Sequence, residues 1–353
     1  MEDRPDAQPE RVGLRVRAFS AGDSARWDAF VYSCPEATFF HRAGWRRVIE
    51  EGLRHPCRYL LAERNGEIEG ILPLAEVRSR LFGHALVSAP CCVYGGVAAA
   101  NEEARLELTR EAVRLADELG VDALEMRNRW PVRPDWPTKA LYVTFRKAIG
   151  EHDEDNLKAI PRKQRAMVRK GIDAGLSSRL LDDADLFFAI YSESVRNLGT
   201  PVFPRRYFRV LFDEFRADSE ISVIAGPGAD IAAVMSFYFR DEVLPYYGGS
   251  RPEARALKGN DFMYWDLMCR AAARGARIFD YGRSKVGTGS YDFKKNWGFT
   301  PEPLYYEYHL VKASEMPEVN PKNPKYRYFI EAWKRLPLPI ANALGPLLAR
   351  NLG

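Results

Sequence analysis

The sequence contains little of the chemistry that holds metal ions. Its five cysteines include no Cys-x-x-Cys pair, and its five histidines are scattered without the spacing of metal ligands. Cys91 and Cys92 are adjacent within an apolar run, which favours buried free thiols over a disulfide. We therefore expect no metal site and no disulfide framework, and this cysteine usage fits a reducing cytoplasm.

Long hydrophobic runs and a strong net charge are also missing. Residues 85–100 carry no charge, but Pro90, Gly95 and Gly96 interrupt them, so no run reaches the length of a transmembrane helix. The first ten residues are acidic and lack the basic-then-apolar pattern of a signal or transit peptide. With 52 basic and 48 acidic residues the net charge is only +4, which gives no general attraction to DNA. We expect a cytoplasmic protein.

What the sequence does contain is one order of elements twice. In each half, apolar periodicity predicts a strand, two helices, a three-strand meander, a helix and two strands. The first half places strands at 14–19, 58–63, 67–77, 85–89, 123–127 and 140–145 and helices at 23–32, 43–52 and 102–119. The second half places strands at 178–181, 221–225, 231–240, 243–248, 277–280 and 304–311 and helices at 183–198, 205–216 and 260–274.

This order is similar to that of N-acetyltransferase-like (GNAT) domains. The resemblance implies an α/β (α+β) fold of two tandem GNAT-like domains, each a mixed, mostly antiparallel sheet flanked by helices. We place the first domain at residues 13–150 and the second, which carries the main site, at residues 151–312. An acidic linker joins them, and residues 313–353 form a proline-rich, aromatic-basic and apolar tail.

GNAT domains usually hold the pyrophosphate of coenzyme A with an Arg/Gln-x-x-Gly-x-Gly/Ala loop before the helix that follows the meander. The corresponding segments here are GGVAAAN in the first half and RPEARALKGN in the second. The second contains Arg255, Lys258 and Gly259 without that spacing, and the first has no basic residue. The sequence therefore predicts no tightly bound cofactor, while coenzyme A stays open as a donor.

Two GNAT-like domains without this loop resemble the FemAB family, the non-ribosomal aminoacyltransferases of cell-wall peptide synthesis. The stretches that carry the resemblance are FFHRAGWRRVIEE, AIPRKQRAMVRKGIDAGL, LKGNDFMYWDLM and FKKNWGF. Their order is similar to that of the branch associated with exosortase and exopolysaccharide loci, and the resemblance covers residues 14–311.

The resemblance implies an acyltransferase or aminoacyltransferase that moves a group from an activated donor to an amine of a cell-envelope, peptidoglycan or exopolysaccharide precursor. The donor would be an aminoacyl-tRNA, an acyl-coenzyme A or an acyl carrier, used as a co-substrate. Two alternatives stay open. One is a coenzyme A- or acyl-carrier-dependent N-acyltransferase, and the other is a non-catalytic GNAT-like scaffold that binds partners.

Residues 258–299 read as a helix, a short strand, a glycine-broken loop and an aromatic-lysine turn. This order should gather Asp280, Arg283 and Lys294 at one strand end, where α/β proteins usually build their sites. We therefore expect the main site there.

The turn itself predicts a short helix. Ser290 is expected to cap it, with Phe293 and Trp297 stacked four residues apart and Lys294 exposed toward the loop. The resemblance implies that Phe293 and Lys294 lie in an acyl-transfer channel. There the lysine would stabilise the oxyanion that forms when an amine attacks an ester or thioester. The alternative is an ordinary surface lysine.

Two carboxylates are candidate general bases. Glu125, in ALEMRN, matches an acidic residue proposed as the base in the family, and Asp280 is its counterpart in the second half. Arg127 and Arg129 would keep Glu125 ionised, as either a base or a structural ion pair requires.

A basic stretch follows the linker. Lys158, Arg162, Arg165 and Arg169 recur at helical spacing beside an apolar stripe, which predicts one helix. Its cations either form a solvated face or attract the phosphates of a tRNA or of a nucleotide- or polyprenyl-linked precursor. The chain lacks the long helical-hairpin arm that the resemblance links to tRNA contact.

Further substrate contacts are implied by the resemblance. Arg205 and Tyr207, in TPVFPRRYF, are candidates for holding the acceptor, and Tyr247 is either a channel wall or a core aromatic. Trp45 matches a family tryptophan, but Ile49 replaces the lysine that commonly follows and grips the diphosphate of the acceptor. This change disfavours a UDP-linked acceptor and leaves another phosphate-bearing or a lipid-linked precursor.

The tail begins with a proline-rich break at residues 317–324 and then runs from aromatic-basic to apolar. Pro337, Pro339 and Pro346 prevent one long helix, and the run is too short to cross a membrane. The tail either seals an apolar face of the second domain or rests on the inner face of the membrane as a peripheral contact. The second arrangement would suit a lipid-linked acceptor.

Overall fold

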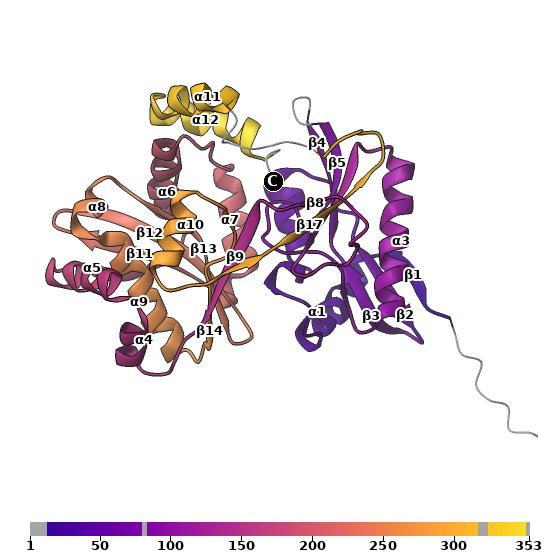
Figure 1. The fold of residues 1–353 in the computed structure, drawn as a ribbon, viewed down its shortest axis with the longest axis horizontal. Helices are drawn as coiled ribbons and strands as arrows, with labels where there is room; N and C mark the ends of the chain where they lie inside the picture. Colours follow the sequence, from indigo (N-terminus) through magenta and orange to yellow (C-terminus); the bar gives the residue numbers. More distant parts are fainter. Residues whose placement is uncertain (1–12, 80–82, 317–323, 351–353) are drawn as a thin grey trace, which may run out of the picture.

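The computed structural model describes residues 13–79, 83–316 and 324–350 (Figure 1). The acidic start of the chain and residues 317–323 of the proline-rich break lie outside the described residues.

The first half keeps the predicted order of elements, with one predicted strand divided in two and two short strands added. Its strands and helices are β1 (Arg15–Ala18), α1 (Ser24–Ser33), α2 (Trp45–Arg47), β2 (Leu60–Arg64), β3 (Glu67–Leu72), β4 (Leu74–Ser79), β5 (Gly83–Ser88), β6 (Ala98–Ala99), α3 (Glu102–Leu119), β7 (Ala123–Asn128), β8 (Thr138–Lys139) and β9 (Tyr142–Ala148). A π-helical segment, Val48–Leu53, continues α2. The single strand expected at 67–77 is wrong, because Pro73 lacks the N–H of a ladder and separates β3 from β4.

The second half also keeps the predicted order. Its elements are α4 (Asp153–Ala159), α5 (Arg162–Asp173), β10 (Ser177–Leu181), α6 (Asp185–Leu198), α7 (Arg205–Glu214), β11 (Ser219–Gly226), β12 (Ala229–Phe239), β13 (Glu242–Ser250), α8 (Glu253–Leu257), α9 (Gly259–Ala273), β14 (Ile278–Asp280), β15 (Ser284–Lys285), α10 (Gly289–Asn296), β16 (Pro301–Pro303) and β17 (Tyr305–Leu310). The tail adds α11 (Pro324–Lys334) and α12 (Leu338–Ala349).

Within the described residues the strands form three sheets, and the two halves exchange strands. β9, from the first half, pairs with β14, β15 and β16 in the large sheet of the second half. β17, from the second half, pairs along its whole length with β7 of the first. A boundary at residue 150 therefore divides the chain but not the sheets, and the domain limits stay a prediction.

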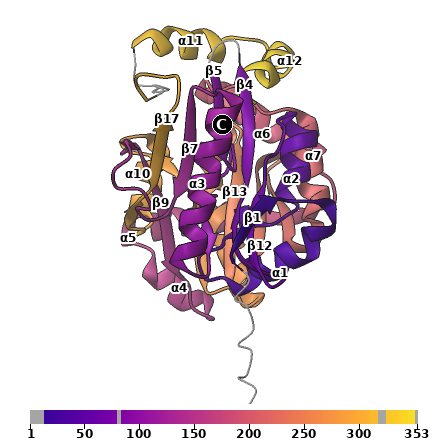
Figure 2. The same ribbon diagram turned by 90° about the vertical axis from the view of Figure 1, so that its right-hand side faces the viewer.

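The large sheet has helices on both faces. A side chain at Gly249 of β13 would meet Tyr191 of α6, whereas one at the preceding Gly248 would meet Tyr264 of α9. Because consecutive strand residues face opposite sides, α6 and α9 cover opposite faces. Figures 1 and 2 show α3 on the outside of the first half and α11 and α12 at one end of the molecule, above α6.

One apolar core joins the two halves. Phe39 of the first half stacks on Phe237 of β12 with ring centroids 4.9 Å apart. Trp45 packs against Phe215 and Tyr246 of the second half, with ring centroids 5.7 and 5.9 Å apart. The halves are therefore joined by packing as well as by exchanged strands.

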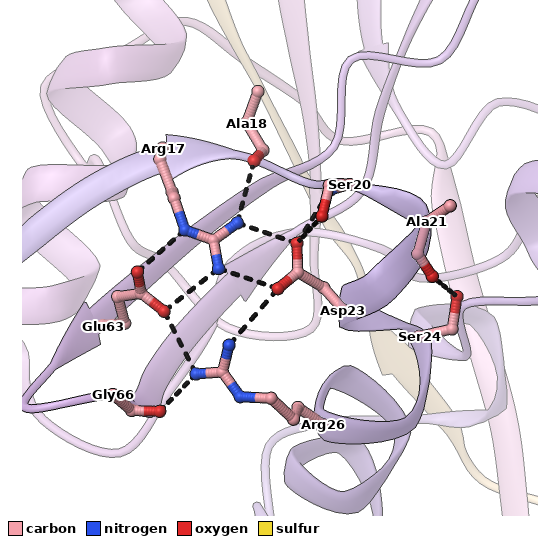
Figure 3. Close-up of polar contacts among 9 residues, drawn as sticks. All are labelled: Arg17, Ala18, Ser20, Ala21, Asp23, Ser24, Arg26, Glu63 and Gly66. Carbon is pink, nitrogen blue, oxygen red and sulfur yellow. Dashed lines mark hydrogen bonds and ion pairs between the residues drawn. The ribbon is translucent and has the colours of Figure 1, made fainter.

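An ion network fastens β1 to β2 and to the start of α1 (Figure 3). Arg17 donates to Glu63 at 2.8 Å and to Asp23 at 2.7 Å, and Arg26 forms ion pairs with both carboxylates. The N–H and hydroxyl of Ser20 also donate to Asp23. The hydrogen bond from Arg17 holds the pKa of the buried Asp23 carboxyl far below its usual range.

The linker and the basic stretch differ from the prediction. Part of the expected linker forms α4, and α5 begins only at Arg162, because Pro161, at the N-cap position of α5, disfavours helix in the residue before it. Lys158 thus belongs to α4, and Arg165 donates to the carbonyl oxygens of Lys158 and Ile160. The prediction that these basic residues share one helix is therefore wrong.

The tail does not form one long helix, as predicted: Pro337 separates α11 from α12, although Pro346 lies inside α12. Asn342 of α12 donates to Ser192 of α6 at 3.3 Å, and Arg196 of α6 donates to the carbonyl oxygen of Lys334 at 3.2 Å. In the part of the chain that the structure describes, no helix has both the length and the apolar character needed to cross a bilayer.

Candidate active site

A cavity opens where β13 and β14 separate. The two strands are parallel for only two residue pairs, Glu242 with Ile278 and Val243 with Phe279. Beyond them lies a cavity of about 340 Å³, whose wall consists of Cys91, Val93, Tyr191, Phe203, Pro245, Tyr246, Tyr247, Gly248, Tyr264, Tyr281, Gly282, Arg283, Ser290 and Lys294. Because Cys91 and Val93 come from the first half, the cavity lies where the halves meet.

A β-bulge brings two consecutive tyrosines into this wall. The pairing of β13 with β12 passes from Tyr247 to Pro245, so Tyr246 is an extra residue on β13. Both tyrosines line the cavity. The Tyr246 hydroxyl donates to the carbonyl oxygen of Cys91 at 2.7 Å, which ties β13 to the first half.

Lys294 of α10 supplies an ammonium group. Its Nζ donates to the carbonyl oxygens of Tyr281, Gly282 and Arg283 at 2.7, 3.0 and 3.1 Å. These bonds use all three donors of an ammonium, whereas a neutral amine has only two. Lys294 is 9% exposed, so the prediction of an exposed lysine is wrong, because α10 packs this residue against the turn after β14.

The charge of Lys294 depends on its surroundings. Burial lowers its pKa to about 7, since the ammonium loses its hydration, and the carboxylate of Asp280 opposes this change while Arg283 adds to it. The three carbonyl acceptors favour the ammonium form. Lys294 is therefore a cation that can lose its charge near neutral pH.

The helix that carries Lys294 begins earlier than predicted. Its N-cap is Thr288, whose extended backbone suits that position, and Ser290 lies inside the first turn, so the predicted cap is wrong. The predicted contact between Phe293 and Trp297 is confirmed, with ring centroids 5.9 Å apart.

Arg283 is the second cation of the cavity wall. Its Nη1 donates to the hydroxyl of Tyr306 at 3.1 Å, and its guanidinium lies 4.6 Å from the ring centre of Tyr142. Both partners belong to exchanged strands, β17 and β9. Among the described residues no carboxylate belongs to the cavity wall, so Arg283 and Lys294 give the cavity a positive character.

Asp280 anchors the turn that holds Lys294. It is 1% exposed and pairs with Arg146 of β9 at 3.2 Å. It also accepts hydrogen bonds from the Tyr94 hydroxyl at 3.1 Å and from the Gly282 N–H at 2.7 Å. The sequence correctly predicted that Asp280 and Lys294 come together. These contacts position the turn, and Asp280 is absent from the cavity wall that the described residues form, contrary to a general base.

Tyrosine and phenylalanine rings form one side of the cavity. Tyr247 packs edge-on against Tyr191 and Phe203, with centroids 5.5 and 6.2 Å apart. The hydroxyls of Tyr247 and Tyr207 are 2.9 Å apart and hydrogen-bonded. Tyr207 is fully buried and supports Tyr247 from behind. Contrary to the prediction, it is not part of the cavity wall.

A second aromatic group lies beside α10. The ring centroid of Tyr264 lies 4.9 Å from that of Tyr281 and 5.7 Å from that of Phe293. Tyr264 and Tyr281 line the cavity, whereas Phe293 is not among the wall residues. Phe293 therefore braces the wall through Tyr264.

Glu125 belongs to a buried ion pair in the first half. Its carboxylate accepts hydrogen bonds from Arg127 Nε at 2.7 Å and from the Tyr308 hydroxyl at 2.8 Å. Burial raises the pKa of Glu125, but Arg127 and Tyr308 outweigh it and hold the pKa below its usual value. Of the two roles open from the sequence, the geometry favours the structural ion pair.

Besides Tyr207 and Phe293, four more predicted substrate contacts lie outside the cavity wall. Trp45 is fully buried in the shared core. Arg205 is exposed at the start of α7, with its guanidinium 4.9 Å from the ring centre of Phe188. Arg162 is exposed on α5, and Arg165 is bound to backbone carbonyls. Burial in the core contradicts the direct contact predicted for Trp45.

The sequence reasoning missed the contribution of the first half. Cys91 and Val93 lie in the uncharged run at residues 85–100, where no periodicity marks them. The backbone of Cys91 adopts φ +67°, in the left-handed region that few residues other than glycine occupy. Tyr191 and Tyr264 were also missed, because their helices are apolar on several sides and mark no single site-facing position.

Residues 158–295 match the family model of the acetyltransferase (GNAT) domain. The match covers less than half of the chain. It includes β10 to β14 and α10 through Lys295, and hence most of the cavity wall. The match confirms the prediction of an acyltransferase-type protein.

Solved structures extend the likeness to both halves. FemX matches with a TM-score of 0.66 at 15% identity, over 84% of this chain and 98% of that one. The C-terminal domain of a putative lysylphosphatidylglycerol synthetase from Agrobacterium fabrum matches with a TM-score of 0.55 at 14% identity, over 82% of this chain and 92% of that one. A tandem GNAT protein from the clavulanic acid biosynthesis pathway matches with a TM-score of 0.55 at 13% identity, over 86% of this chain and 100% of that one.

At these identities the likeness shows the fold alone. It is a tandem GNAT fold shared with FemX of the FemAB family, as the sequence predicts. A search of curated proteins found no match.

The stretch that matches the GNAT model lacks the usual grip on coenzyme A. In place of an open loop before α9, the short helix α8 leads directly into it, and Lys258 between them adopts φ +60°. A side chain at Gly259 would lie 2.9 Å from Cβ of Ala254, so α8 covers the first residue of α9. The residues present do not fit a pyrophosphate cradle at this position.

Proposed function

We propose that the protein is a FemAB-like transferase that moves an aminoacyl or acyl group from an activated donor to an amine of a cell-envelope, peptidoglycan or exopolysaccharide precursor. The observation that carries the proposal is the cavity between β13 and β14. It combines two cations, Arg283 and Lys294, with an aromatic wall and lies in a GNAT fold.

The chemistry of acyl transfer suits this wall. When the amine attacks the carbonyl carbon, a C–N bond forms and negative charge gathers on the carbonyl oxygen. The ester or thioester bond then breaks, and the amine proton leaves to the departing group or to water. Lys294 would stabilise the developing charge through its own charge, and Arg283 would donate hydrogen bonds. An activated donor can react this way without a carboxylate base in the wall.

The proposed donor and acceptor follow from the fold and from the start of α9. The fold of FemX and of a domain named for lysylphosphatidylglycerol synthesis supports an acceptor in the cell envelope. The covered start of α9 favours an aminoacyl-tRNA or acyl carrier over coenzyme A as the donor. Arg162 and Arg205, both exposed, stay proposed as contacts for phosphates of either substrate.

The test is transfer by the full chain from aminoacyl-tRNA, acyl-carrier and acyl-coenzyme A donors to amine acceptors. Lys294→Met should lower kcat/KM by roughly two to three orders of magnitude, and Arg283→Gln by a similar factor. Lys295→Met, an exposed neighbour on α10, is the matched control and should keep full activity.

Unchanged transfer in a folded Lys294→Met variant would overturn the role of the lysine. If none of the donors gives turnover, the binding scaffold would be favoured. Turnover with acyl-coenzyme A alone, together with a higher melting temperature in coenzyme A, would favour the N-acyltransferase alternative.

A further inference from the structure

The outward face of α12 is apolar, which is unusual for a helix on the surface of a protein. Ala341, Gly345 and Ala349, spaced four residues apart, are buried, whereas Ile340 and Leu344 are 45% and 44% exposed. The small side chains therefore face the protein and the large ones face outward. A helix that covers a core shows the reverse arrangement.

No charged residue interrupts this surface from Leu336 to Ala349. Leu347 of the same helix is 60% exposed, and Leu198, next to Gly199, which approaches Ile330 of α11, is 68% exposed. α11 adds Tyr328 and Phe329, which are 75% and 40% exposed. We call this set, together with Ile340 and Leu344, the tail surface.

The helices that carry the tail surface have an excess of positive charge. The described side chains from 327 to 350 include four basic residues, Arg327, Lys334, Arg335 and Arg350, and one acidic residue, Glu331. Glu331 is already paired with Lys334 at 2.8 Å. The remaining cations would meet an anionic partner.

The two helices are fixed in this orientation. A side chain at Gly345 would lie 2.9 Å from the backbone of Val202, so α12 lies in close contact with the loop before α7. The Nε2–H of His55, in the first half, donates to the carbonyl oxygen of Arg350 at 2.6 Å. Trp333 of α11 is 4% exposed and anchors that helix. Both helices lie at one end of the molecule (Figures 1 and 2), and the exposed side chains of α12 face away from the protein.

We propose that the tail surface docks on an anionic lipid bilayer. Exposed aromatic and large aliphatic side chains together with an excess of cations are the chemistry of helices that lie in the interface of acidic membranes. α12 is about 18 Å long, from its 12 residues, which is too short to span. A second copy of the chain is a poorer occupant, because a symmetric contact would bring the basic helices of both copies together.

Docking would place the cavity near the bilayer. Val202, which contacts α12, precedes Phe203 of the cavity wall, and α6 carries both Ser192, which binds α12, and Tyr191 of that wall. If the transfer proposed above takes place in the cavity, an acceptor carried by a lipid would reach it from the membrane surface. The docking itself does not depend on that reaction.

The test is co-sedimentation of the full chain with vesicles of phosphatidylcholine, with and without phosphatidylglycerol. The wild type should bind the phosphatidylglycerol vesicles and lose binding at high salt. The double variant Ile340→Glu/Leu344→Glu and the double variant Arg327→Gln/Arg335→Gln should each bind at least about tenfold more weakly. Leu180→Glu is the control, because Leu180 is 57% exposed on β10 and outside the tail surface, and it should bind as the wild type does.

All these side chains are exposed, so the melting temperatures should stay within a few degrees of the wild type. Equal binding by the wild type and the Ile340→Glu/Leu344→Glu variant would overturn the proposal, as would failure of the wild type to bind phosphatidylglycerol vesicles. A wild-type dimer that this variant converts to a monomer would show instead that the surface joins two copies. None of these readouts requires transfer activity, so the proposed function can fail independently.

Discussion

Lys294 combines a low pKa with a position that the proposed reaction would need charged. Its pKa is about 7 in the folded protein, whereas a lysine in an unfolded chain titrates near 10.4. If the ammonium form supports transfer, kcat should fall as the pH rises through about 7. A pH–rate profile under saturating substrate will measure this, and the profile of the much slower Lys294→Met variant should lack that falling limb.

A falling limb that persists unchanged in Lys294→Met would assign the titration to another group. Lys295→Met serves again as the control, because it changes a neighbouring lysine on the same helix without touching the three carbonyl oxygens that hold Lys294. Its profile should match that of the wild type.

Asp23 should make the first half sensitive to acid. Its pKa is held far below the unfolded value of about 3.9, so the folded state binds fewer protons and the stabilisation is present above about pH 4 and lost as the pH falls. Asp23→Asn should lower the free energy of unfolding at pH 7 by about 1–3 kcal/mol. Urea unfolding at several pH values should show the difference from the wild type shrinking toward low pH.

The control for Asp23 is a surface pair of the same type. Asp213 pairs with Arg216 at 2.8 Å, with both side chains more than half exposed. Asp213→Asn should cost less than about 1 kcal/mol. An equal loss for the two variants would mean that burial of the network in Figure 3 adds nothing to its strength.

At the scale of elements, local periodicity predicted most helices and strands but not their partners. α3 matches the predicted 102–119 because Asn101 caps its start and Gly120, at φ +57°, ends it, and both signals are local. The exchange of β9 and β17 leaves no such signal, since strand order along the chain does not determine which sheet a strand joins. Lys294 was predicted in the right place with the wrong exposure, because its three acceptors are backbone carbonyls of a turn.

The close approach of β13 to α9 should control the size of the cavity. A Cβ at Gly248 would lie 2.6 Å from the hydroxyl of Tyr264, and both residues line the cavity. Gly248→Ala should displace that ring into the cavity and lower kcat/KM by roughly tenfold or more, with a stability loss of about 1–3 kcal/mol from overpacking. Gly289→Ala is the control, because a Cβ there meets nothing within 4 Å. Full activity in Gly248→Ala would show that the ring can move without affecting the site.

At the scale of the whole molecule, the two halves complete each other. Arg283, in the cavity wall, contacts Tyr306 of β17 and Tyr142 of β9, which are the exchanged strands. Asp280 likewise pairs with Arg146 of β9. Separation of the halves would therefore remove partners from both sheets and from the cavity, and we expect the chain to unfold as one cooperative unit.

This cooperativity can be tested with a core substitution in the first half. Leu108 of α3 is fully buried beside Gly70 of β3, so Leu108→Ala should lower the free energy of unfolding by about 2–5 kcal/mol. Hydrogen exchange should then quicken by the same factor in β7 and in β12 of the second half, because the slowest amides of both exchange through one global opening. Leu106→Ala, at a position 42% exposed on the same helix, should change neither. If β7 loses protection while β12 keeps it, the halves open separately, and the exchanged strands hold the two sheets together less strongly than either core holds itself.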